Sequence, residues 1–183
     1  MRRAQTGDER AFDEIVARFG SLVLVVARSI TRHRQDAEDV AQEAFLKLFR
    51  TLDRCDPDRP LEPWLVKLTL NAARNRVARR PERREDELGA EAVWPADRKS
   101  DPSAALRQRE LRAALLEAMA GLPQRAREVF LLREVNGLET AWVAEAMGIT
   151  EVTVRRLASE ARLRVTEWLR VHRPELVVDL GRR

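Results

Sequence analysis

The 183-residue sequence contains one cysteine, two histidines and no tyrosine. Cys55 alone cannot form an intramolecular disulfide, and His33 and His172 lie too far apart in sequence to build a recognisable zinc site with it. The longest apolar run, residues 22–27, is far too short to span a bilayer, and the first ten residues are polar rather than signal-like. These absences exclude a disulfide-stapled secreted protein and predict a cytoplasmic chain without membrane insertion.

Catalytic signatures are missing as well. The sequence has no glycine-rich phosphate loop and no metal-ligand spacing, and Cys55 has no histidine near it in sequence. An enzyme is therefore the least favoured class. We expect no catalytic residue, no metal and no cofactor.

What the sequence has is helix formers. Ala, Leu, Glu and Arg supply 98 of the 183 residues, whereas isoleucine occurs three times, which predicts an all-α fold. The net charge is +4, and all but three of the 34 basic residues are arginine. Arginine binds phosphate and guanine edges through two parallel hydrogen bonds, so this bias suits nucleic acid. A GC-rich genome would enrich arginine and alanine without any such role, so composition does not decide between the two causes.

The charges are arranged in three blocks. Residues 1–80 carry a net charge of +4, residues 81–103 carry −3 and residues 104–183 carry +3. The middle block contains prolines and a glycine and has no sustained apolar period, apart from a lone Trp94. We therefore expect two small helical domains, 1–80 and 104–183, joined by a flexible acidic linker over 81–103.

Apolar spacing and cap residues place the helices within these blocks. Thr6 and Asp8 are candidate caps for the first helix, and Gly121 is a candidate left-handed cap after the fourth. The predicted helices cover residues 8–30, 36–52, 63–80, 102–120, 123–137, 139–147 and 151–170.

Residues 140–159, TAWVAEAMGITEVTVRRLAS, carry the sharpest local pattern. A helix-turn-helix needs a small residue where the helices cross, a glycine in the turn and a shared apolar core. Ala144 and Gly148 fill the first two positions, and Thr150 can cap the second helix. The expected core positions are Val143, Met147, Ile149, Val154 and Leu157, which leaves Glu151, Val152, Arg155, Arg156, Ser159 and Glu160 on the outer faces.

A second basic constellation is NAARNRVARRPERR, residues 71–84, with six arginines and one acid. On a helix, Arg76, Arg79, Arg80 and Arg83 would gather on one side as a track for phosphates. Basic residues at a helix C-terminus are also favoured by the helix dipole alone, so a merely solvated helix end is the alternative.

Four blocks in order, DAEDVAQEAFLKLFR, WLVKLTLNAARNRVARR, LPQRAREVFLLREVNGLE and the helix-turn-helix, resemble the bacterial extracytoplasmic function (ECF) sigma factors of the sigma-70 family. The resemblance covers nearly the whole chain. It implies a sigma factor that binds core RNA polymerase and directs initiation at promoters with minus-10 and minus-35 elements. It also implies a cognate anti-sigma factor as a partner.

The resemblance assigns roles to individual positions. Residues 122–139 would seat on the flap tip of the second-largest polymerase subunit, and the linker would thread the polymerase cleft. The residues implied to bind the clamp helices of the largest subunit are Asp39, Gln42 and Glu43. Those implied at the minus-10 element are Trp64, Asn71, Arg74, Arg76, Arg79 and Arg80, and those implied at the minus-35 element are Thr153, Arg155, Arg156 and Ser159.

Several of these positions allow a second interpretation. The acidic face near Asp39 could be solvated, Trp64 could belong to the core, and the linker could be a simple tether. Leu157 and Glu160 stand where the family often has arginine, which leaves the DNA contacts there undetermined. An ordinary helix-turn-helix regulator, with an N-terminal domain for dimerisation or sensing, is the alternative function, and a redox role for Cys55 is open.

Overall fold

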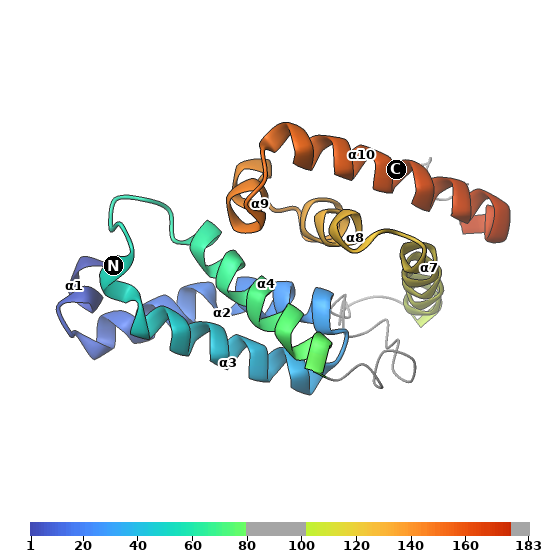
Figure 1. Ribbon diagram of the computed structural model, residues 1–183. Coiled ribbons are helices and arrows are strands. Elements are labelled where there is room, and N and C mark those ends of the chain that lie inside the picture. The colour runs from blue at the N-terminus through green and yellow to red at the C-terminus, as the bar shows by residue number, and fades with distance from the viewer. Residues whose placement is uncertain (80–101, 177–183) are drawn as a thin grey trace.

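The computed structural model describes residues 1–79 and 102–176. These residues form helices and no strand, which confirms the all-α prediction (Figure 1). The linker with Trp94, together with Arg80 and Arg83, lies outside the described residues. The helices are α1 (Arg2–Gln5), α2 (Glu9–Thr31), α3 (Arg34–Arg50), the 3-10 turn η1 (Leu52–Arg54), α4 (Glu62–Arg79), α7 (Pro102–Ala120), α8 (Gln124–Phe130), the π turn η2 (Leu131–Val135), α9 (Thr140–Met147) and α10 (Glu151–His172).

In the N-terminal unit, α2 and α3 lie side by side and α4 packs on both (Figure 1). Asp8 is the cap of α2, because its carboxylate accepts the Ala11 N–H at 3.1 Å. Thr6 instead ends α1, a single turn that the sequence analysis missed. His33 rather than Asp36 precedes α3, and its ring accepts the Asp36 N–H.

In the C-terminal unit, α10 packs along α7, α8 and α9. Gly121 follows α7 but has no positive φ, so the expected left-handed cap is wrong. Arg127 caps the C-terminus of α7 instead. Its guanidinium donates hydrogen bonds to the carbonyls of Met119, Ala120 and Leu122 at 2.8–3.0 Å. Carbonyls at a helix end need such donors, and a side chain from the next helix supplies them without a glycine.

The helix expected over 123–137 has an irregular last turn. It is α-helical to Phe130 and then widens to a π turn, in which the Asn136 N–H donates to the Leu131 carbonyl at 2.9 Å. Gly137 follows with φ +67° and lets the chain reverse toward α9. Widened turns of this kind are rare and are often found at functional positions.

The two units share a core. Helix α4 is in direct contact with α9 (Figure 1), and Arg74 of α4 forms an ion pair with Glu128 of α8. One apolar cluster draws residues from both units, all of them nearly inaccessible to solvent. Its members include Val26, Val66 and Leu70 from the N-terminal unit and Val129, Leu132, Leu138, Val143 and Val154 from the C-terminal unit.

Candidate functional site

Helices α9 and α10 form the helix-turn-helix that the sequence predicts. Gly148 ends α9 in the left-handed conformation at φ +64°, and its N–H reaches the last carbonyls of the helix. Thr150 caps α10, since its hydroxyl accepts the Thr153 N–H at 3.2 Å. Val143, Ala144 and Val154 are buried where the helices cross, while Met147, Ile149 and Leu157 are partly buried at the edge of this core.

The outer face of α10 is accessible at three of the four positions expected to read DNA. Arg155, Arg156 and Ser159 are exposed. Within the described part of the chain, the two arginines form exposed ion pairs one turn away, Arg155 with Glu151 at 2.5 Å and Arg156 with Glu160 at 2.6 Å. Exposed pairs of this kind contribute about 0.3–0.5 kcal/mol, so phosphate or a guanine edge can displace them readily.

Two further residues, Thr153 and Val152, lie in the first turn of α10. The Thr153 hydroxyl lies 2.8 Å from the Thr150 hydroxyl, so it takes part in the cap of α10. Val152 is 70% exposed in the first turn of the recognition helix.

A groove of about 810 Å³ runs between α2 and α3, on the side away from α4. Phe12 and Phe49 form its most prominent contact, an edge-to-face ring pair with centroids 5.1 Å apart. Glu9, Asp13 and Glu38 make the rim acidic. The lining is otherwise mostly apolar and consists of Phe12, Val16, Gly20, Leu24, Ala41, Gln42, Phe45, Leu46 and Phe49.

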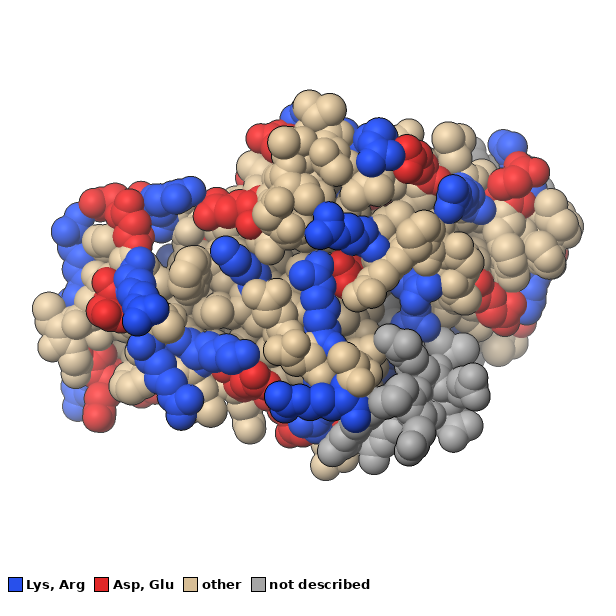
Figure 2. Space-filling view, viewed as in Figure 1, with Lys and Arg blue, Asp and Glu red and all other residues tan. Residues whose placement is uncertain are grey.

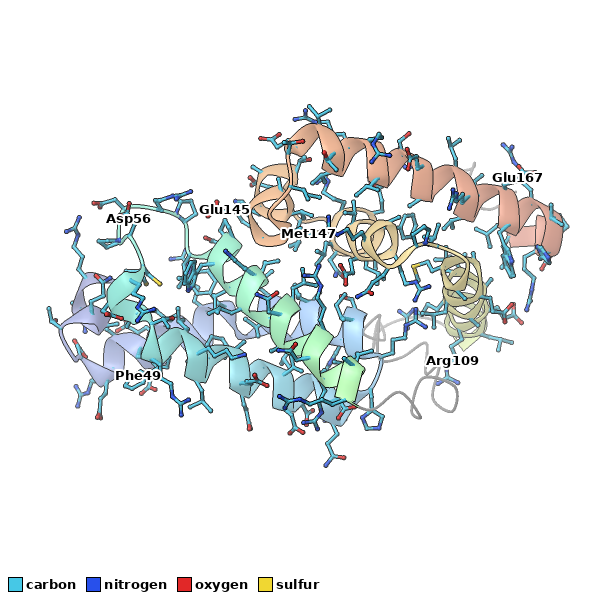
Figure 3. The ribbon with its side chains drawn as sticks, viewed as in Figure 1. Phe49, Asp56, Arg109, Glu145, Met147 and Glu167 are labelled. Carbon is cyan, nitrogen blue, oxygen red and sulfur yellow. The ribbon has the colours of Figure 1, made fainter. Side chains whose placement is uncertain are left out.

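Two of the groove residues are large and exposed. Leu46 is 57% exposed and Phe49 58% exposed, and Figure 3 shows Phe49 on the outer edge of α3. The sequence analysis missed both. They fall outside the buried stripe of α3, and apolar side chains on the polar face of an amphipathic helix were the signal available to find them.

One of the three predicted polymerase-binding residues lies in this groove, and the other two are on the exposed surface of the same helix. Asp39, Gln42 and Glu43 are all exposed on α3, and Gln42 lines the groove itself. Glu43 pairs with Lys47 at 2.7 Å, and Asp39 pairs with Arg76 of α4. The structure therefore gathers the three on one accessible face next to Leu46 and Phe49.

On α4, Trp64 is partly buried against the N-terminal core. Lys67 lies over its ring, 5.7 Å from the centroid, and the indole N–H is buried without a hydrogen-bond partner among the described residues. A tryptophan normally pairs this N–H when it is buried. Trp64 is thus part core and part accessible ring beside a cation.

The described basic residues of α4 point in different directions, and the predicted track also includes Arg80 and Arg83, which lie outside the described residues. Arg74 donates to both Glu128 oxygens of α8, at 3.0 and 2.6 Å. Arg76 points instead to α3, where its hydrogen bond to Asp36 raises the pKa of its guanidinium. Asn71 and Arg79 remain exposed. Figure 2 shows basic side chains spread over the face in view, with acidic ones between them.

Within residues 1–79 and 102–176, no group of three or more histidine, cysteine or acidic side chains could hold a metal ion. None of the helices in the same part of the chain is long and apolar enough to cross a membrane.

Comparison with known proteins gives matches for both units. The family models "Sigma-70 region 2" and "Sigma-70, region 4" match residues 15–83 and 112–165. The ECF RNA polymerase sigma-E factor of Escherichia coli strain K12 is 32% identical over 170 residues, which cover 88% of each chain. The probable RNA polymerase sigma factor RfaY of Xanthomonas campestris is 35% identical over 167 residues, but the chain spans only 41% of that relative's length.

Among solved structures, that of CnrH in complex with the cytosolic domain of CnrY superposes with a TM-score of 0.68. The match is 26% identical in sequence and covers 93% of this chain and 95% of that one.

A helix-turn-helix with an open recognition face, joined to a second helical unit, is the arrangement of a DNA-binding transcription factor. The two family models and the sigma-E relative identify which one. The chain belongs to the ECF subfamily of the sigma-70 family of RNA polymerase sigma factors. Its relatives are sigma factors, which are not enzymes.

Proposed function

We propose that this chain is a dissociable promoter-specificity subunit: it binds core RNA polymerase, directs it to a two-part promoter and opens the upstream edge of the bubble. The observation that carries the proposal is the separation of two surfaces in one chain, the recognition face of α10 and the groove of α3. It acts in the bacterial cytoplasm and performs no catalysis, and it needs no cofactor.

The groove surface is the proposed site for the clamp helices of the largest polymerase subunit. Gln42 and Glu43 supply polar contacts, and Leu46 and Phe49 supply the apolar anchors that carry most of the energy at interfaces. A coiled pair of helices fits an open groove of this size, and the acidic rim favours a basic partner.

The minus-10 surface is proposed for the loop before α4 and for α4 itself. Its residues are Trp64, Asn71, Arg74, Arg76, Arg79 and Arg80. A separated strand requires a stacking surface beside cations, and the Trp64 ring with Lys67 over it has that chemistry. Extruding a base costs a few kcal/mol, which binding of the exposed strand supplies without ATP.

The minus-35 surface is proposed for the first turns of α10. Arg155, Arg156 and Ser159 face outward, and Thr153 orders the N-terminus of the helix through its contact with Thr150. A recognition helix places its N-terminal residues against base edges in the major groove.

We propose domain boundaries at 1–80 and 104–183, with the acidic segment 81–103 as the linker through the polymerase cleft. Residues 122–139 are the proposed seat for the flap tip of the second-largest subunit. A cognate anti-sigma factor is the proposed regulator, and the solved complex of CnrH with the cytosolic domain of CnrY supports it.

One experiment separates this function from an ordinary regulator. The purified chain is mixed with core polymerase or with duplex DNA carrying its promoter, and complex formation is followed by gel filtration and mobility shift. A sigma factor co-elutes with core and needs core to hold the promoter. Tight duplex binding by the chain alone, with no binding to core, would establish the regulator instead.

A further inference from the structure

The first turn of the recognition helix presents a large apolar side chain to solvent. Helix α10 begins at Glu151 and forms the outer edge of the C-terminal unit in Figure 1. Val152, its second residue, is 70% exposed. Val154 points the opposite way and is fully buried in the core between α9 and α10. Val152 is therefore not one of the residues that hold the helix-turn-helix together.

Val152 lies on the same face of α10 as the residues expected to contact the minus-35 element. Arg155, Arg156 and Ser159 follow it at three, four and seven residues, the spacing of neighbours on one side of a helix. All four are exposed. The recognition face therefore combines two guanidinium groups and a hydroxyl with one apolar surface at its N-terminal end.

The residues on either side of Val152 have polar partners within the helix. The Glu151 carboxylate is paired with Arg155 at 2.5 Å. The Thr153 hydroxyl lies 2.8 Å from that of Thr150, which also accepts the Thr153 N–H. Val152 is the side chain between them, and its surface is open to a partner from outside the helix.

Helix stability gives no reason for valine at this position. A β-branched side chain loses χ1 freedom in a helix, and alanine does not have this cost. Burial offsets such a loss in a core, but Val152 is exposed. We therefore expect the contribution of Val152 to lie in binding rather than in folding.

The DNA base edge that suits an apolar side chain is that of thymine. In the major groove thymine presents its C5 methyl group, which makes apolar contacts with protein side chains. A recognition helix places its N-terminal residues against these base edges. The Cβ atoms of residues three or four apart on a helix are separated by about 5–6 Å, and base pairs are stacked about 3.4 Å apart. A base pair beside Val152 is therefore one or two steps from those beside Arg155 and Arg156.

We propose that Val152 contacts the methyl group of one thymine in the minus-35 element, one or two base pairs from those that Arg155 and Arg156 contact. The inference rests on the proposed binding of the minus-35 element by α10. The arginines bind phosphate and guanine edges, whereas Val152 adds a preference for thymine at a single position.

The test uses the full chain assembled with core polymerase, and the promoter mapped from transcript starts after overexpression. Each thymine of the minus-35 element is replaced in turn by uracil, which removes only the methyl group. One replacement should weaken promoter binding by the wild type about fourfold, the value of one buried methyl group. Val152→Ala should bind the thymine and uracil duplexes equally.

Leu163→Ala is the matched control, because Leu163 is also 70% exposed on α10 but lies eleven residues further along. It should keep the sensitivity of the wild type to the methyl group. Urea unfolding should show that Val152→Ala is at least as stable as the wild type, which separates lost binding from lost structure.

A wild-type complex that is insensitive to every thymine methyl group, or a methyl effect that persists in Val152→Ala, would overturn the proposal. Weaker binding of Val152→Ala to core without DNA would also overturn it, since Val152 would then be a polymerase contact. If the chain binds the duplex without core, the proposed sigma-factor function fails. The same uracil replacements then apply to that complex, where loss of methyl sensitivity in Val152→Ala supports the thymine contact.

Discussion

Arg76 of α4 joins two carboxylates of α3 that differ in their burial. Its Nη2 lies 2.7 Å from Oδ1 of Asp36, and the same guanidinium also contacts Asp39. The Asp36 side chain is 9% exposed and that of Asp39 is 47% exposed. The inner carboxylate therefore ties α3 to α4, and the outer one remains accessible to a partner.

Because Asp36 and Asp39 differ in burial, we expect the same Asp-to-Asn substitution to affect stability at one position and polymerase binding at the other. Asp36→Asn should lower the free energy of unfolding by about 1–3 kcal/mol, because it breaks a charged hydrogen bond in a buried setting. Asp39→Asn should cost less than about 1 kcal/mol but weaken co-purification with core polymerase. Urea unfolding and a pull-down measure the two effects. Unchanged core binding in Asp39→Asn would reassign Asp39 to solvent, and a loss of stability equal to that of Asp36→Asn would show that Asp39 is structural.

The recognition helix predicts a loss of promoter binding without a loss of stability. Replacing Arg155 and Arg156 together with Ala should abolish minus-35-dependent transcription and change the unfolding free energy by no more than about 1 kcal/mol, since both residues are exposed. Core binding should be retained. Arg170→Ala, at an exposed position near the other end of α10, is the control. Joint loss of core binding and transcription would show that the pair is structural.

If the groove between α2 and α3 binds core polymerase, its exposed apolar residues should contribute most of the binding free energy. Leu46→Asp should weaken core binding by tenfold or more, about 1.4 kcal/mol or above, while leaving the melting temperature nearly unchanged. Leu163→Asp is the control, because Leu163 is 70% exposed on α10, away from the groove. If both variants bind core as the wild type does, the groove is not the polymerase surface.

We expect glycine-to-alanine substitutions in the turn of the helix-turn-helix and within α2 to change the free energy of unfolding in opposite directions. Gly148→Ala should destabilise by about 1 kcal/mol, because φ is +64° there and a Cβ strains the left-handed region. Gly20→Ala should stabilise by up to about 1 kcal/mol, since Gly20 lies within α2 with open space around its Cα. Denaturant unfolding compares the two. A stabilising Gly148→Ala would contradict the turn geometry.

We expect the thiol of Cys55 to react slowly with alkylating reagents. It is buried, and burial, followed by the charge of Asp53, raises the pKa of its thiol. Raising that pKa lowers the thiolate fraction at neutral pH, so native Cys55 should react with iodoacetamide far more slowly than the unfolded chain does. Cys55→Ala should keep transcription insensitive to peroxide, as in the wild type. Rapid peroxide inactivation of the wild type alone would reveal a redox role.

The sequence predicts the helices well wherever apolar period and cap chemistry agree. The turn from Gly148 to Thr150 is a case in which small residue, left-handed glycine and capping threonine point to the same structure. Prediction failed where a distant side chain replaced a local signal. Arg127 caps α7 across eight residues, so the glycine at position 121 had no left-handed role to fill.

For the site residues too, local patterns were predictable and contacts with distant side chains were not. The faces of α3 and α10 follow from helical spacing, whereas the partners of Arg74 and Arg76 do not. Those two arginines are neighbours in sequence, yet they point to different helices and bind Glu128 and Asp36, 54 and 40 residues away. Spacing along one helix contains no information about which distant carboxylate faces it, so the sequence could not supply these two partners.

The most direct test of the account is run-off transcription with purified components. Transcript starts mapped after overexpression supply a promoter, and core polymerase is then assayed on it with and without the chain. The account predicts a specific transcript only when core and the chain are both present, lost with Arg155→Ala and Arg156→Ala together and reduced with Leu46→Asp. A transcript that core alone produces equally well, or none under any combination, would contradict the assignment as a promoter-specificity subunit.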